Sequence, residues 1–369
     1  MQVTLKKAGL KDVLEMIAPL KKGCMRGSSV FSLEAVAGED ASTGSAVIVG
    51  VNPSVRTTTK IPATVTATGK VCFTLDGGAS EILAQCPGPD IEFTSMGDSG
   101  VHVISGPVTA DIPTVPEDKM SVCNPAGDIT SSYQLSGDDF LDAIKKTAFT
   151  CRGETYGEVT NCVAFLFSGG KMTVLSTDRK RISVCGIAAT GEVEQTVVLP
   201  EGSIHALLCI IKAGSKLTLG VSENTVTVST ETASTSAPRA KLEYPLLLSV
   251  LPKAFECTVT LNRTAFLDSI KRMIVINENC LVIDFDPATG KMMISAKNPA
   301  VGELSEVHDV SADKKFSKLF RPSYLQETLE AQKAETVNLR FVSTTEVAAV
   351  SVSGDPDYMY LVMPMSNPA

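Results

Sequence analysis

Three histidines and one Gly-Asp-Ser-Gly sequence are the residues of this chain best suited to catalysis, and their spacing does not support it. His102, His205 and His308 lie far apart, without the HExxH or cysteine–histidine spacing of a zinc site. Residues 97–100 have the order found around some nucleophilic serines, but no histidine precedes Ser99. We therefore interpret this segment as a hairpin turn. The chain also lacks the glycine-rich loops GxGxxG and GxxxxGK[ST]. The sequence predicts no enzyme, no metal and no cofactor.

Composition is typical of a globular protein. The 369 residues leave room for two or three domains, and 44% apolar with 20% charged residues excludes a disordered chain. Ten cysteines are scattered singly, which favours reduced, mostly buried thiols. The N-terminal MQVTLKKAGLKDVLEMIAPL is amphipathic and lacks the apolar core of a signal peptide, and no later stretch approaches eighteen apolar residues. We expect a cytoplasmic protein that does not bind membranes.

The charge of the chain gives two opposing indications. A net charge of −8 argues against nucleic acid, because contacts to phosphate require lysine and arginine. Net charge, however, does not say where the charges lie. Basic residues form local clusters, which are Lys21, Lys22 and Arg26; Lys145 and Lys146; Arg179, Lys180 and Arg181; and Lys271 and Arg272. Each cluster alone is typical of a solvated helix face.

An internal repeat organises the chain. VTLKKAGLKDVLEMI from Val3, YQLSGDDFLDAIKKT from Tyr133 and VTLNRTAFLDSIKRM from Val259 align without gaps. Apolar residues at i, i+4 and i+7 predict that each copy is a short strand followed by a helix with one buried face. Ser136 and Asn262 are expected to cap the helices of the second and third copies.

A second helical pattern follows in each third, near 77–86, 201–211 and 321–332, and alternating strands come after it. The fold class is therefore α+β, with three tandem units built on one plan. Polar or proline-bearing segments near 120–131 and 248–256 separate the units. We predict domains at 1–125, 126–250 and 251–369.

Four segments give the chain a specific resemblance. They are LSTDRKRISVC at 175–185, PLLLSVLP at 245–252, MISAKNPAVGELSEVHDV at 293–310 and YLVMPM at 360–365. In order and spacing they resemble the bacterial DNA sliding clamp, the beta subunit of DNA polymerase III, whether bacterial or phage-encoded. The first third resembles that family least.

This resemblance implies a head-to-tail homodimeric ring that encircles duplex DNA and tethers the replicative polymerase, conferring processivity. Helices would face the channel and antiparallel sheets would form the outer wall. Partners would be double-stranded DNA of any sequence, a second copy of the chain, the replicative polymerase, an ATP-driven clamp loader and other proteins with clamp-binding motifs. The expected channel residues are Arg26, Lys145, Lys146, Lys212, Lys271 and Arg272. The expected dimer-interface residues are Ala110, Ile274 and Val275.

The apolar segment YMYLVMPM at 358–365, close to the C-terminus, has two interpretations. From the residues alone it is a final core strand or part of a surface that another molecule covers. In the sliding-clamp family the C-terminal strand lines a hydrophobic pocket for partner peptides, between the second and third domains. The residues that match its wall are Thr160, Thr177, Arg179, Lys180, Arg181, Ile182, Pro245, Ser249, Val250, Leu361, Val362, Met363, Pro364 and Met365. Arg179 and Lys180 replace a glycine and a histidine that are more usual in the family, so the sequence motif of the preferred peptide is not determined.

Two other functions remain compatible with the sequence. One is a monomeric processivity factor or DNA-binding factor of related fold. The other is a structural or scaffolding protein that repeats its domain. The mass in solution distinguishes a dimeric clamp from the first, and release from DNA when a circle is cut distinguishes it from the second.

Overall fold

The computed structural model describes residues 1–21, 28–39, 43–97, 100–122, 127–151, 158–311, 314–342, 348–352 and 355–365. The chain divides into two compact units. Unit 1 comprises Met1–Asp138, Ala189–Val193 and Gly202–Lys241, and unit 2 comprises Asp139–Ala188, Glu194–Glu201 and Leu242–Ala369. The division into three domains at 125/126 and 250/251 stays a prediction. Asp98 and Ser99, in the expected hairpin turn, and Arg26, expected in the channel, lie outside the described residues.

Unit 1 is built on an extended antiparallel sheet with the strand order β8-β7-β6-β1-β4-β16-β15-β14-β9. On a branch from β4, β3 pairs with β4 and β2, and β2 pairs with β5. The strands are β1 (Gln2–Lys6), β2 (Val30–Val36), β3 (Gly44–Val51), β4 (Arg56–Ala67), β5 (Gly69–Thr74), β6 (Asp90–Ser95), β7 (Val101–Ser105), β8 (Val108–Ile112), β9 (Ser131–Ser136), β14 (Lys216–Val221), β15 (Thr225–Ser229) and β16 (Ala233–Pro238).

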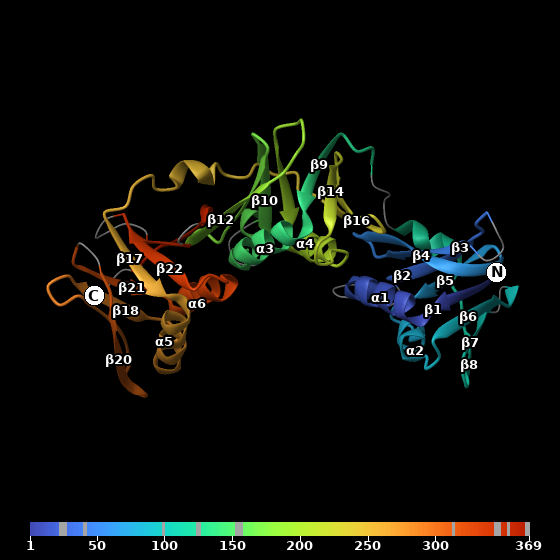
Figure 1. Ribbon diagram of the computed structural model, residues 1–369, viewed down its shortest axis with the longest axis horizontal. Helices are drawn as coiled ribbons and strands as arrows, with labels where there is room; N and C mark the ends of the chain where they lie inside the picture. Colours follow the sequence, from blue (N-terminus) through green and yellow to red (C-terminus); the bar gives the residue numbers. More distant parts are fainter. Residues whose placement is uncertain are drawn as a thin grey trace. The chain divides into compact units, whose positions relative to one another are not determined.

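Strands from the first and middle thirds of the chain meet within unit 1, where β4 pairs with β16 (Figure 1). The buried hydroxyl groups of Thr57 and Thr235 hydrogen-bond across this pair at 3.0 Å. Thr59 Oγ1 also donates to the carbonyl of Thr232 at 3.2 Å. Because cross-strand threonine pairs stabilise a sheet, they help to join the two repeats at this seam.

Unit 2 contains two antiparallel sheets. The larger has the order β13-β10-β11-β12-β24-β23-β22-β17, and the smaller has the order β20-β19-β18-β21. The strands of the larger sheet are β10 (Cys162–Ser168), β11 (Lys171–Thr177), β12 (Arg181–Ala188), β13 (Gln195–Pro200), β17 (Cys257–Asn262), β22 (Thr336–Phe341), β23 (Ala348–Val352) and β24 (Asp355–Val362). Those of the smaller are β18 (Leu281–Asp286), β19 (Lys291–Asn298), β20 (Gly302–Asp309) and β21 (Phe316–Phe320).

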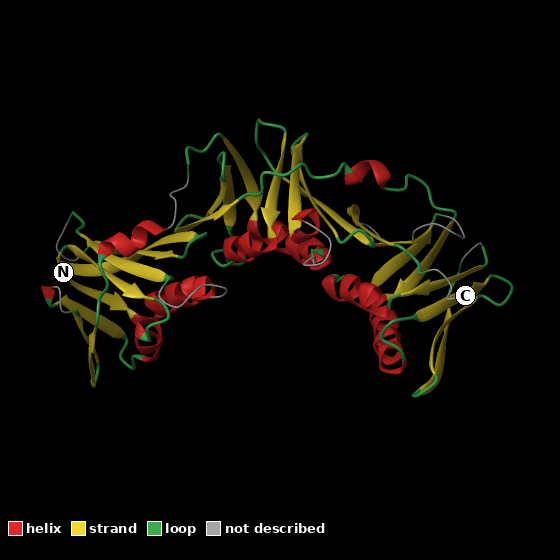
Figure 2. Cartoon of the chain, turned by 180° about the vertical axis from the view of Figure 1, so that it is seen from behind, coloured by secondary structure: helices red, strands yellow, loops and turns green. Residues whose placement is uncertain are grey.

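The repeated strand–helix unit predicted from the sequence is confirmed. Its helices are α1 (Lys7–Ile17), α3 (Gly137–Thr147) and α5 (Arg263–Ile276), which follow β1, β9 and β17. The second helix of each third is α2 (Ala79–Gln85), α4 (Glu201–Leu208) and α6 (Pro322–Ala331). Figure 2 shows α5 and α6 together on one side of the strands of unit 2.

The helices adopt their positions because each has one apolar face. Phe140 and Ile144 of α3 are almost fully buried, as are Phe266 and Ile270 of α5. Such a stripe packs against the sheet and leaves the charged face outward. Asn262 caps α5 as expected, since its side chain accepts a hydrogen bond from the amide of Ala265 at 3.0 Å.

The cysteines of the described residues are free thiols, and most are buried. Burial raises the pKa of Cys151 and of Cys185 to about 12, so both thiols stay protonated and unreactive. Within the described ranges no group of histidine, cysteine and carboxylate side chains could hold a metal ion. The described helices are all too short or too polar to cross a membrane.

Candidate partner-peptide and nucleic-acid interfaces

The apolar C-terminal segment begins as a core strand. β24 lies between β12 and β23 in the larger sheet of unit 2, and Val362 pairs with Arg181 on one side and Ala348 on the other. Tyr358, Tyr360 and Val362 are at most 1% exposed. Because an interior strand of a sheet is covered on both edges, this part of the segment serves the fold. The core-strand interpretation is correct up to Val362.

Beyond Val362 the backbone remains hydrogen-bonded, but the methionine side chains become exposed. The amide of Met363 donates to the carbonyl of Lys180 at 2.9 Å, and the amide of Met365 donates to the carbonyl of Leu319 at 2.8 Å. The backbone is thus held on both sides of Pro364, which has no amide hydrogen to donate. The side chains of Met363 and Met365 nevertheless remain 53% and 42% exposed. Two apolar side chains are therefore held at the surface by fixed backbone.

The turn between β11 and β12 lies against this tail and is itself closely determined. Thr177 Oγ1 accepts the amide of Arg179 at 3.0 Å, and Asp178 Oδ1 accepts the amides of Lys180 and Arg181, each at 3.0 Å. Arg179 has a φ of +71°, a left-handed conformation that glycine adopts more readily than arginine. The Thr-Asp pair thus fixes the backbone that presents Arg179 and Lys180 to solvent.

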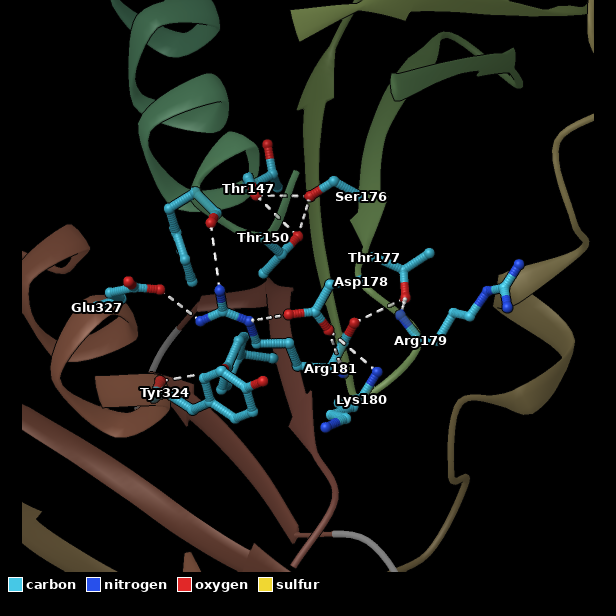
Figure 3. Close-up of polar contacts among 12 residues, drawn as sticks. Thr147, Thr150, Ser176, Thr177, Asp178, Arg179, Lys180, Arg181, Tyr324 and Glu327 are labelled. Carbon is cyan, nitrogen blue, oxygen red and sulfur yellow. Dashed lines mark hydrogen bonds and ion pairs between the residues drawn. The ribbon is translucent and has the colours of Figure 1, made fainter. Parts of the chain in front are cut away.

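Arg181 lies beneath the turn and is not part of its surface. Its side chain is 2% exposed, donates to Asp178 Oδ2 at 2.8 Å and forms a second ion pair with Glu327 of α6. The guanidinium also stacks over the ring of Tyr324, 4.2 Å from its centroid (Figure 3). Burial opposes the charge, but interactions with Tyr360, Glu327 and Asp178 outweigh it and raise the pKa of Arg181. This arginine therefore joins the turn to α6.

A second group of exposed apolar side chains lies in the segment that leads from β16 to β17. A short 3₁₀ helix, Leu247–Val250, follows Tyr244, whose hydroxyl donates to the carbonyl of Cys162 at 3.5 Å. Leu246 is 81% exposed and Val250 is 60% exposed. Isolated exposed leucines are common, but several in one segment indicate an interaction surface.

The predicted wall residues separate by burial into three classes. Those buried are Thr160, Thr177, Arg181, Leu361 and Val362; those half-buried are Ile182 and Pro364; and those exposed are Arg179, Lys180, Pro245, Ser249, Val250, Met363 and Met365. The buried residues support the surface and offer little area to a ligand. Leu246 and Leu248 are exposed and were not predicted, although the run of three leucines at 246–248 could have signalled them.

Most of the predicted channel cations are already paired within the chain. Lys212 contacts Asp12 at 2.9 Å. This pair lies beside a hollow of about 830 Å³ in unit 1, which residues of α1 and β4 line. Lys271 contacts Glu330 at 3.1 Å. Lys146 is 13% exposed and lies 2.8 Å from Asp142 and 3.1 Å from Asp355. These two carboxylates overcome the effect of burial and raise the pKa of Lys146.

Lys145 differs from its neighbour Lys146. It is exposed in the last turn of α3, and within the described residues it has no ion pair. We expect Lys145→Glu to weaken binding to every duplex DNA alike and to lower the slope of log affinity against log salt by about 1 to 2, because one cation is lost and one anion gained. Anisotropy of a short labelled duplex at low salt measures both quantities.

Lys146→Gln is the matched comparison. It should leave DNA binding nearly unchanged and lower stability by about 1–2 kcal/mol, because Asp142 and Asp355 lose a charged donor. If Lys146→Gln weakened DNA binding as much as Lys145→Glu, the distinction between the two lysines would be wrong.

Comparison with known proteins identifies the family. Residues 134–245 match the sequence profile of the DNA polymerase III beta subunit, central domain, and residues 248–366 match that of its C-terminal domain. The chain belongs to the beta sliding clamp family. The beta sliding clamp of Rickettsia felis is 22% identical over 314 residues, which cover 78% of this chain and 80% of that protein. That of Pseudomonas putida is 25% identical over 262 residues, covering 69% of this chain and 68% of that clamp.

Solved clamps have the same fold along the whole chain. The DNA polymerase III beta subunit of Thermotoga maritima superposes with a TM-score of 0.88 at 18% identity, with 100% of both chains covered. A sliding clamp from Pseudomonas aeruginosa, solved bound to griselimycin, gives a TM-score of 0.90 at 17% identity, again over 100% of both chains. The α+β clamp fold predicted from the sequence is therefore confirmed.

Several strands pair on one side only among the described residues of this clamp chain, and two of them, β8 and β20, carry or contact the predicted interface residues. β8 is the last strand of the sheet in unit 1 and carries Ala110, which is half-buried. β20 is the last strand of the smaller sheet in unit 2 and carries Val307, 56% exposed. Ile274 is half-buried and Val275 is 76% exposed at the end of α5, which packs against β20. Uncovered edges with exposed apolar side chains are suited to pairing with another chain.

Arg272 is committed to a polar cluster between α5 and β20. Its Nη2 donates to Glu306 Oε2 at 2.8 Å, and Ser269 Oγ donates to the same oxygen at 2.7 Å. Ser269 Oγ also lies 2.9 Å from His308 Nε2. The serine is fully buried, and the carboxylate contacts the serine, so the arrangement differs from a catalytic triad, in which the carboxylate orients the histidine. The cluster serves to fix β20 on α5.

The same cluster predicts a pH dependence. Hydrogen bonding from Arg272 lowers the pKa of Glu306 from 4.5 to about 2. A carboxyl whose folded-state pKa is depressed stabilises the fold above pH 4.5, and this stabilisation is lost as the pH falls from 4.5 to 2. We expect Glu306→Gln to lose less stability than the wild type between pH 5 and pH 3, as measured by the urea midpoint. Ser305→Ala, on the same strand, should follow the wild type. An identical fall for Glu306→Gln would contradict the assignment.

Proposed function

We propose that this chain forms a head-to-tail homodimeric ring that encircles duplex DNA and holds the replicative polymerase on it. Sliding clamps bind DNA and polymerase, form dimers, confer processivity and catalyse no reaction. The observation that carries the proposal is the match of residues 134–245 and 248–366 to the central and C-terminal domains of the family. A ring holds DNA by topology, so it needs no base-specific contact.

The charge pattern supports sliding. Lys146, Lys212, Lys271 and Arg272 each form ion pairs with acidic residues of the same chain, and the net charge is −8. Affinity for DNA grows with the number of phosphates that are neutralised. A channel with few free cations therefore attracts the duplex weakly, which lets the ring move along it. Among the described residues that we propose for the channel, Lys145 is the one without an ion pair.

The open edges support the dimer. In our proposal β8 of one subunit pairs with β20 of the other, and Ile274 and Val275 cover the apolar part of the contact. Two such contacts close a ring and leave neither edge exposed. Ala110 offers little apolar area on the β8 side, so we expect a dimer weaker than a larger residue would allow.

The partner surface would consist of Arg179, Lys180, Met363 and Met365 with the segment 245–250. Peptides of the polymerase, of a clamp loader and of other clamp-binding proteins would dock there through an aliphatic or aromatic anchor. Methionine side chains suit several partners, because thioethers repack at low cost. A replication factor of this kind would act in the cytoplasm.

A topological experiment tests the function. The chain, loaded onto nicked circular DNA by an ATP-driven clamp loader, should co-elute with the circle in gel filtration and be released when a restriction enzyme cuts it. Light scattering of the free protein should give about twice the 38.9 kDa of the chain. Equal retention on circular and linear DNA, with a monomeric mass, would instead establish a monomeric DNA-binding factor.

A further inference from the structure

We propose that the turn 177–181 selects partner peptides that carry a carboxylate beside their apolar anchor. The inference rests on the proposed function of this turn and of Met363 as a peptide-docking surface, and it specifies the chemistry of the peptide. Arg179 would bind the carboxylate, Lys180 would add to the local positive potential, and Met363 would contact the anchor.

The two cations of the turn are available to a ligand. Arg179 and Lys180 are exposed, and among the described residues neither has an ion pair. The carboxylate next to them in sequence is Asp178, and it is fully engaged. Its Oδ2 accepts from Arg181 Nε at 2.8 Å, and its Oδ1 accepts two backbone amides. Asp178 therefore cannot neutralise Arg179 or Lys180 without releasing the buried Arg181.

The backbone position of Arg179 is fixed. Its amide is held by Thr177 Oγ1, and the turn is anchored from below by the ion pairs of Arg181 (Figure 3). The Arg179 side chain extends away from that cluster (Figure 3). The fixed backbone limits where the guanidinium can reach, and its planar fork matches a carboxylate with two parallel hydrogen bonds.

Arg179 occupies a backbone conformation that glycine fits better. At φ +71° a side chain carries a steric penalty that glycine avoids. Glycine would satisfy the turn, so the arginine is not explained by the fold. A side chain that is kept at a strained, exposed position and has no ion pair among the described residues indicates a partner on another molecule.

The two cations lie beside the exposed apolar side chain of Met363. The amide of Met363 donates to the carbonyl of Lys180, which places the exposed methionine beside the two cations. A ligand that covers Met363 thus brings its neighbouring residue near Arg179. Because the whole chain has a net charge of −8, an acidic peptide is not attracted at long range, and the selection must come from these local contacts.

Two synthetic peptides test the inference. Both carry the same leucine–phenylalanine anchor; one has an aspartate next to it and the other has asparagine. In calorimetric titrations the wild type should bind the aspartate peptide about tenfold more tightly, which corresponds to about 1.4 kcal/mol. Arg179→Gly should reduce this preference to about twofold, the part that Lys180 supplies, and should weaken the aspartate peptide more than the asparagine peptide. Its melting temperature should not fall, because glycine fits the left-handed turn.

Two further variants separate the possible failures. Lys297→Gln removes the same amount of charge from an exposed site on β19 and should keep the preference. Met363→Ala should weaken both peptides by a similar factor. If the wild type binds both peptides equally and Met363→Ala weakens them, the docking surface stands and the carboxylate preference is wrong. If neither peptide binds, or Met363→Ala binds both as well as the wild type, the docking surface itself is wrong, and the inference fails with it.

Discussion

Replacing Arg181 with methionine is expected to lower the free energy of unfolding of unit 2 by about 3–5 kcal/mol, the largest stability effect that we predict for a single substitution. The change leaves Asp178 and Glu327 without their cation, and their side chains are only 9% and 19% exposed. It also removes the stacking on Tyr324. Denaturant unfolding, followed by a probe in unit 2 such as tyrosine fluorescence, measures the loss.

Two variants make this result specific. Arg179→Met changes the same residue type two positions earlier, where the side chain is exposed, and should alter stability by less than about 0.5 kcal/mol. Adding Glu327→Met to Arg181→Met should recover part of the loss, because one of the two carboxylates that lose the Arg181 cation is removed. If Arg181→Met unfolded at the same denaturant concentration as Arg179→Met, the buried ion pairs would not be stabilising the turn.

The double variant Ile274→Ala with Val275→Ala is expected to convert the dimer into monomers at micromolar concentration. Val275 is 76% exposed, so its truncation should barely disturb the fold of the chain. In the proposed interface both side chains are buried, and truncating two central aliphatic residues raises a dissociation constant by roughly a hundredfold or more. Light scattering at a protein concentration of about 1 μM measures the mass directly.

The matched control changes an exposed isoleucine and an exposed valine elsewhere. Ile129 and Val193 are 56% and 45% exposed in unit 1, and their joint replacement by alanine should leave the dimer intact. The circular dichroism of both double variants should equal that of the wild type. A dimeric mass for Ile274→Ala with Val275→Ala would place the interface elsewhere. This variant should then also stay on nicked circular DNA and leave it only when the circle is cut, as the wild type does.

Local patterns were sufficient for the repeated strand–helix units. The three aligned copies predicted β1–α1, β9–α3 and β17–α5, because a helix that packs on a sheet must repeat its apolar residues with the period of the helix. The same pattern placed Phe140 and Phe266 in the core. Asn262 was predicted as a cap from its position alone, because capping is a contact between residues three apart in sequence.

The burial and ion pairing of the charged residues could not be predicted from the sequence. Lys145 and Lys146 are adjacent and equivalent as letters, yet Lys146 is paired with Asp355, 209 positions away, and Lys145 is exposed. Arg181 was expected in the wall of the pocket, but Glu327, 146 positions away, holds it in the interior. Such pairs depend on which strands and helices the fold brings together.

The sequence by itself determined the repeated α+β plan, the family and the segments that form the candidate partner surface, since these follow from periodicity and from specific runs such as TDRKR and LVMPM. The tertiary structure decided which residues of those segments a partner can reach. It placed β24 between β12 and β23, which buries Leu361 and Val362 and leaves Met363 and Met365 exposed. The physical reason is that burial and ion pairing are set by neighbours distant in the chain, whereas a sequence pattern reports only residues one or two turns apart.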